Sequence, residues 1–145
     1  MNINIKKEFI IGSYAFFNNY DDYKIKDIDK LCILDKKISN SDKLLNIKIK
    51  NKDIFLIYDY SKNELIENCI KTNIPLAVGK FIVPEYAKYI NLTIDDLKKL
   101  ENLFNKLDNS HSYEKIIYNS YIENNDFTLS KSQLDLVYNE YKKTR

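Results

Sequence analysis

The place of Gly12-Ser13 in the chain makes this residue pair a candidate for ligand binding. It directly follows a short apolar run that ends at Ile11, in a chain with only two glycines. Glycine lets the backbone turn tightly and approach a ligand closely. The first N–H groups of a helix that began at Ser13 would have no partner within that helix, and they would suit a phosphate group. The pair is therefore a candidate phosphate-binding turn, to which the serine hydroxyl could add a hydrogen bond.

Two aspartates follow at a spacing that suits a metal site. Asp27 and Asp29 are two residues apart in the segment 26–34, "KDIDKLCIL", which is predicted to be a strand. Side chains alternate between the two faces of a strand, so both carboxylates are expected on one face. Two such carboxylates repel each other unless a cation lies between them. Mg²⁺, or Mn²⁺ in its place, prefers oxygen ligands of this kind.

A third carboxylate would complete a site for two metal ions. Asp53 and Asp59 are the candidates, at the two ends of the segment "DIFLIYD". About 20 Å of strand separates them, so only one can reach the same metal ions. Asp53 is preferred because it stands at the start of a predicted hairpin strand, near the rim of the sheet, and Asp59 is the alternative. A phosphate-binding turn and a carboxylate cluster together suit phosphoryl or nucleotidyl transfer.

The elements that must position these residues indicate an α+β fold. Strands are predicted mainly in the first half of the chain, at 7–11, 26–34, 46–50, 53–58 and, as an edge-like strand, 74–81. Helices are predicted from Ser13 and over 61–72, 83–90, 92–108, 112–125 and 129–143. We expect a single domain over 1–145, with a core at about 1–80 that contains a small mixed sheet backed by helices. A helical C-terminal segment is expected at about 81–145.

Composition and charge exclude several classes of protein. The net charge is +2, from 23 basic and 21 acidic residues, which is too balanced for a protein whose main task is to coat nucleic acid. No apolar run has the length of a membrane span, and the N-terminus lacks the apolar centre of a signal peptide. These features predict no membrane association and a cytoplasmic location, in a cell, an infected host cell or a virus factory. Cys32 and Cys69 lack the spacing of a zinc site and are predicted to be reduced, mostly buried thiols.

The order of these residues resembles the nucleotidyltransferase superfamily related to DNA polymerase β. An apolar strand is followed by Gly12-Ser13, then by 13 residues, then by Asp27-Ile28-Asp29. The chain looks most like the small stand-alone members of phages, large DNA viruses and bacteria. The resemblance covers roughly residues 7 to 60, and it implies a nucleotidyltransferase-like palm.

The resemblance implies a role for each candidate residue. Gly12 and Ser13 would hold the triphosphate of a nucleoside triphosphate (NTP) substrate. Asp27 and Asp29 would bind two Mg²⁺ ions, and Asp53 would be the third carboxylate, which helps to activate the acceptor. The implied reaction transfers a nucleoside monophosphate to an RNA end, a protein side chain or a small molecule. A partner protein or a homo-oligomer could supply the acceptor site.

The chain departs from the family pattern in ways that leave two alternatives open. Lys30 follows the second aspartate, where the family usually has an apolar residue, and no arginine-rich segment follows Gly12-Ser13. One alternative is a catalytically inactive protein of the same fold that acts as a viral or host-interaction subunit. The other is an unrelated α+β binding module in which Gly12-Ser13 only caps a helix.

Overall fold

The computed structural model describes residues 4–36, 45–49, 52–59, 61–73, 79 and 82–144. Its internal contacts divide the chain into two compact units, residues 1–61 and residues 62–145. The division falls between Ser61 and Lys62, where the last strand of the sheet gives way to the first long helix. The expected single domain over 1–145 stays a prediction.

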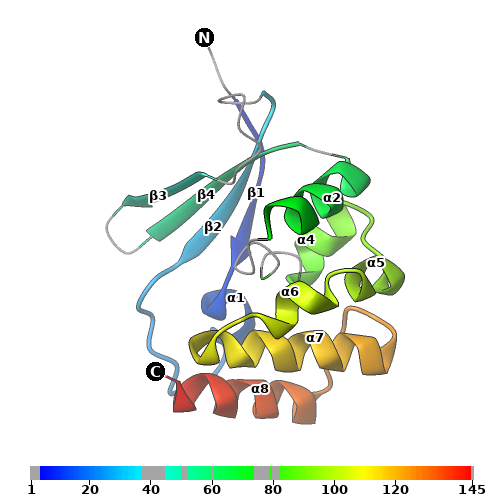
Figure 1. The fold of residues 1–145 in the computed structure, drawn as a ribbon. Coiled ribbons are helices and arrows are strands. Elements are labelled where there is room, and N and C mark those ends of the chain that lie inside the picture. Colours follow the sequence, from blue (N-terminus) through cyan, green and yellow to red (C-terminus); the bar gives the residue numbers. More distant parts are fainter. Residues whose placement is uncertain are drawn as a thin grey trace. The chain divides into compact units, whose positions relative to one another are not determined.

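The described residues of the first unit form a four-stranded sheet with the order β1-β2-β4-β3 (Figure 1). Its strands are β1 (Ile5–Ile11), β2 (Asp29–Leu34), β3 (Leu45–Ile49) and β4 (Lys52–Tyr58). The outer strands β1 and β3 run antiparallel to their neighbours, whereas β2 and β4 are parallel. The predicted α+β class and small mixed sheet are confirmed, and so is the hairpin, since β3 pairs with β4.

The second strand is shorter than predicted. The sequence predicts a strand over 26–34, but β2 begins at Asp29. Ile11, the last residue of β1, is the pairing partner of Asp29, and the chain turns away at Gly12. Residues before Asp29 therefore have no partner on β1, and residues 23–28 have no regular structure.

The two faces of the sheet differ in burial. Alternate residues on one face, Phe9, Ile11, Leu31 and Ile33, are each at most 4% exposed. On the opposite face, Glu8 and Ile10 are exposed although Cys32 and Leu34 are buried. The first face therefore carries the apolar core of β1 and β2, and Asp29 lies at its end, opposite Ile11.

The second unit is helical. Its helices within the described residues are α2 (Lys62–Thr72), α4 (Pro84–Tyr89), α5 (Ile94–Lys98), α6 (Glu101–Asn105), the short 3₁₀ helix η1 (Asn109–His111), α7 (Ser112–Asn124) and α8 (Lys131–Lys143). Helices α7 and α8 lie side by side and antiparallel (Figure 1). The predicted edge-like strand 74–81 lies outside the described residues except for Gly79. No helix in the described part of the chain is long and apolar enough to cross a membrane.

Tyrosines form much of the core of this helical unit. Four of them are at most 8% exposed, namely Tyr118, Tyr121, Tyr138 and Tyr141. The Tyr121 hydroxyl donates to the Ile82 carbonyl oxygen at 2.7 Å, and the Tyr118 ring stacks on Phe104. Rings buried in this way cannot present a stacking surface to a base or to a partner protein.

The helix predicted over 92–108 is interrupted. Helices α5 and α6 occupy this range and are separated at Lys99 and Leu100, where backbone N–H groups bond to carbonyls three residues back. The apolar residues Ile94, Leu97, Leu100 and Leu103 recur every three residues, and all are buried. A continuous helix with 3.6 residues per turn would carry this stripe around its axis. The tighter turns between α5 and α6, with three residues per turn, keep the stripe facing the core.

A buried acid stabilises the start of α5. Asp96 is 6% exposed and accepts hydrogen bonds from the backbone N–H of Thr93 at 3.0 Å and from its hydroxyl at 2.9 Å. Lys62 Nζ, from the start of α2, lies 2.8 Å from its Oδ2. Burial alone would raise the pKa of Asp96, but the hydrogen bonds from Lys62 and Thr93 outweigh burial and lower that pKa below its ordinary value. The carboxylate therefore ties α2 to α5 in its charged form.

The lowered pKa of Asp96 predicts a pH-dependent part of the stability. Its contribution is fully present above the unfolded-state pKa of about 4, and it is lost as the pH falls through the lower folded-state value. Asp96→Asn should lower the free energy of unfolding at neutral pH and flatten its decline below about pH 4. Urea unfolding across this pH range measures both effects, with the exposed neighbour Asp95→Asn as the control. An Asp96→Asn profile parallel to that of the wild type would contradict the prediction.

Candidate functional site

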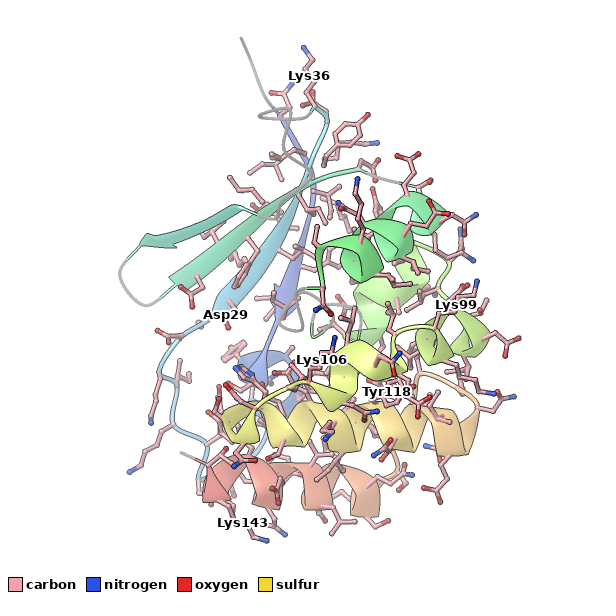
Figure 2. All side chains as sticks on the ribbon, viewed as in Figure 1. Asp29, Lys36, Lys99, Lys106, Tyr118 and Lys143 are labelled. Carbon is pink, nitrogen blue, oxygen red and sulfur yellow. The ribbon has the colours of Figure 1, made fainter. Side chains whose placement is uncertain are left out.

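Gly12 and Asp29 lie in close contact at the end of the β1–β2 pair. Gly12 has φ 76° and ψ −161°, a backbone conformation that essentially only glycine adopts. A Cβ atom built on Gly12 would lie only 2.8 Å from Oδ2 of Asp29. Figure 2 shows Asp29 at the start of β2. The glycine therefore serves both the turn and the close approach of the carboxylate to the backbone.

Asp53 stands beside Asp29 in the sheet. In the parallel pair, Lys30 lies opposite Ile54, so the preceding residues Asp29 and Asp53 are neighbours across β2 and β4. Residues that lie side by side on parallel strands point to the same face of the sheet, so Asp29 and Asp53 share a face. Neighbouring strands are about 4.8 Å apart. The structure thus places one preferred carboxylate at the same sheet end as the Gly12 turn.

Asp59 lies at the opposite end of the same strands. Its backbone N–H donates to the Leu34 carbonyl at 3.2 Å, beyond the last paired residues of β2 and β4. Its carboxylate forms an ion pair with Lys6. The distance to Asp53 along the strand is about 20 Å. Of the two candidates for a third carboxylate, only Asp53 is therefore near Asp29.

Asp27 lies two residues before β2, in the segment without regular structure, and is half-buried. The expectation that Asp27 and Asp29 share a face assumed that both were in a strand. Since the strand begins at Asp29, strand geometry does not decide where the Asp27 carboxylate points. Whether Asp27 joins the other two carboxylates stays a prediction.

Ser13 begins the short helix α1 (Ser13–Phe17) and contacts an aromatic residue that the sequence analysis did not single out. Its Oγ lies 2.7 Å from the phenol oxygen of Tyr23. Aromatic residues stand at every third position here, namely Tyr14, Phe17, Tyr20 and Tyr23. Turns with i to i+3 backbone hydrogen bonds follow α1, from Tyr20 to Phe17 and from Tyr23 to Tyr20. The three-residue spacing was the signal that could have predicted this cluster.

Lys30 does not enter the apolar face of the sheet. Its side chain is 31% exposed, and its Nζ lies 3.9 Å from Oε2 of Glu8 on the neighbouring strand. Glu8 and Ile10 on the same face are exposed, so the lysine is accommodated near solvent. Its presence after Asp29 is therefore compatible with a carboxylate on the other face.

The carboxylates fit Mg²⁺ in kind. Asp29, Asp53 and Asp27 offer only oxygen ligands, and Mg²⁺ is usually held by one or two carboxylates, with substrate phosphates and waters completing its shell. Within the described residues, no group of three or more histidine, cysteine, aspartate or glutamate side chains is close enough to hold a metal ion. The strands of the sheet place two candidate carboxylate ligands next to each other, Asp29 and Asp53. Cys32 and Cys69 are free and buried, as predicted.

Comparison with known proteins finds no matching family model, no similar curated protein and no similar solved structure. The resemblance to the nucleotidyltransferase superfamily therefore continues to rest on the motif residues alone.

Proposed function

We propose that this chain is a minimal nucleotidyltransferase that binds an NTP with Mg²⁺ and transfers its nucleoside monophosphate to an acceptor. The observation that carries the proposal is the convergence of Gly12, Asp29 and Asp53 at one end of the sheet. A backbone turn that excludes a side chain lies directly against a carboxylate there, and a second carboxylate lies on the adjacent strand. Carboxylate oxygens beside a backbone turn that has no side chain suit a triphosphate and its metal ions.

Each residue has a role in this proposal. Asp29 and Asp53, with Asp27 as a further ligand, would hold Mg²⁺, and Gly12 and Ser13 would hold the phosphates. Bound Mg²⁺ would neutralise the charge of the phosphates. The acceptor hydroxyl would attack the α-phosphorus as the bond to the β-phosphate oxygen breaks and pyrophosphate leaves. Asp53 would help to take the proton of that hydroxyl.

The acceptor is proposed to be an RNA end, a protein side chain or a small molecule. The proposed site would hold the nucleotide and its metal ions, and we propose that a partner protein or a second copy of the chain helps to hold the acceptor. We propose the cytoplasm, of a cell or of an infected host, as the place of action.

A specific observation also favours the inactive alternative. No three candidate ligands are assembled among the described residues, which is what a nucleotidyltransferase-fold protein with only a structural or host-interaction role would show. The two proposals differ in whether the chain binds nucleotide with metal.

A nucleotide-binding assay separates them. We expect the wild type to bind at least one of ATP, GTP, CTP and UTP in Mg²⁺ or Mn²⁺, and to lose that binding in EDTA. Asp53→Asn should weaken binding about tenfold or more, because one ligand of the cation loses its charge. Asp59→Asn makes the same chemical change at the far end of the same strand and should stay within about twofold of the wild type. No binding by the wild type, or equal losses in the two variants, would contradict the proposal.

A further inference from the structure

We propose that Tyr23 is a positioning residue that orients the Ser13 hydroxyl for hydrogen bonding to a phosphate oxygen of the nucleotide, an inference that rests on the function proposed above. The observation is the contact of 2.7 Å between the Tyr23 phenol oxygen and Ser13 Oγ. It joins two hydroxyl groups from segments ten residues apart, next to Gly12.

The direction of the hydrogen bonds follows from the ligand. A serine hydroxyl has a single proton to donate, and a phosphate oxygen can only accept. When Ser13 donates to a phosphate, its oxygen is left to accept from Tyr23. A phenol is the more acidic hydroxyl and the better donor, and hydrogen bonds in such a chain polarise one another. Tyr23 would therefore both fix the serine rotamer and strengthen its bond to the anion.

The position of the phenol is itself fixed by packing. The Tyr23 ring lies 6.2 Å from the Phe17 ring and 6.5 Å from the Tyr14 ring, measured between centroids. Phe17 is fully buried, and Tyr20 packs edge-on against it. An aromatic cluster thus holds the hydroxyl in place before a ligand arrives, which reduces the entropy lost on binding.

The proposed contact with phosphate is made by the side chains of Ser13 and Tyr23 and does not need the N-terminus of α1, which has only five residues. The aromatic residues spaced three apart from Tyr14 to Tyr23 would then serve to hold the Tyr23 hydroxyl in place. A cluster with only a packing role would need the rings but not the phenol oxygen of Tyr23.

A double-mutant cycle on nucleotide affinity tests the inference. The probes are ATP, GTP, CTP and UTP with excess Mg²⁺, titrated into the wild type, Tyr23→Phe, Ser13→Ala and the double variant. Tyr23→Phe keeps the ring and removes one hydroxyl, so we expect about a fivefold to tenfold loss of affinity with little change in melting temperature. In the Ser13→Ala background the same change should have less than about a twofold effect, because Tyr23 acts through Ser13.

The control is Tyr14→Phe, which removes a hydroxyl from a neighbouring ring of the same cluster and should leave the affinity within about twofold. If the wild type binds nucleotide and Tyr23→Phe has no effect, or the same effect with and without Ser13, the inference fails while the proposed function stands. A wild type that binds none of the four nucleotides overturns both.

Discussion

Replacing Asp29 by asparagine is expected to lower the rate of Mg²⁺-dependent nucleotidyl transfer about a thousandfold or more. Asparagine keeps the shape of the side chain but lacks the charge that holds the cation beside Gly12. The loss of a metal ligand in a reaction of this kind costs several kcal/mol of transition-state stabilisation, which corresponds to a rate effect of this size. The measurement is release of pyrophosphate from each of the four NTPs, in the presence of RNA and protein acceptors.

Asp35 provides the matched control for Asp29, because it directly follows the other end of β2. Its Oδ1 accepts a hydrogen bond from the Asn4 backbone N–H at 3.0 Å, remote from the Gly12 turn. Asp35→Asn should leave the transfer rate within about twofold. Both variants should melt within a few degrees of the wild type. An Asp29→Asn protein that retains the transfer rate would contradict the role of Asp29 as a metal ligand. A variant that loses the rate together with its fold would indicate a structural aspartate.

Replacing Gly12 by alanine is expected to lower the melting temperature by roughly 5–10 °C and to abolish nucleotide binding. The backbone conformation of Gly12, at φ 76° and ψ −161°, costs a residue with a side chain about 1–3 kcal/mol. The new Cβ would also lie 2.8 Å from Oδ2 of Asp29, so the carboxylate must move. For a chain of this size, each kcal/mol shifts the melting temperature by about 2–4 °C. Thermal unfolding followed by circular dichroism measures the change.

A second variant separates the two causes of that loss. In the Gly12→Ala background, Asp29→Ala removes the carboxylate oxygen that the new Cβ would meet. Part of the lost stability should return, and the remainder is the cost of the backbone conformation. If the two substitutions destabilise additively, the close contact between Gly12 and the Asp29 carboxylate is not the reason for the glycine.

The sequence predicted those parts of the fold that follow from local patterns. The strand that ends before Gly12, the helix that starts at Ser13 and the β3–β4 hairpin all lie where alternation and glycine placement indicate them. The predicted end of β2 at Leu34 is confirmed, but its start at Asp29 was not predictable in this way, because it depends on where the pairing with β1 ends. The break between α5 and α6 has a local signal, since the apolar residues from Ile94 to Leu103 recur every three residues, as in a 3₁₀ helix.

In the candidate site, too, the residue types could be read from the sequence, whereas their proximity depends on contacts between distant segments. The sequence favoured Asp53 over Asp59 because Asp53 begins a predicted hairpin strand, but whether Asp53 lies near Asp29 also depends on how the strands pair. The parallel pairing of β2 with β4 decides it, and pairing between strands more than twenty residues apart is set by the fold as a whole. The contact between Ser13 and Tyr23 likewise depends on how the turns after α1 fold back.

A crystal structure of the chain with Mn²⁺ and an NTP analogue that cannot be cleaved between its α- and β-phosphates would show directly whether nucleotide and metal bind beside Gly12, Asp29 and Asp53. Mn²⁺ replaces Mg²⁺ at oxygen sites and is located by its anomalous scattering. We expect a Mn²⁺ ion within about 2.0–2.3 Å of carboxylate oxygens of both Asp29 and Asp53. We also expect triphosphate oxygens to contact the backbone of Gly12 and the hydroxyl of Ser13. A nucleotide bound elsewhere, or metal and nucleotide both absent from this end of the sheet at saturating concentrations, would contradict the account.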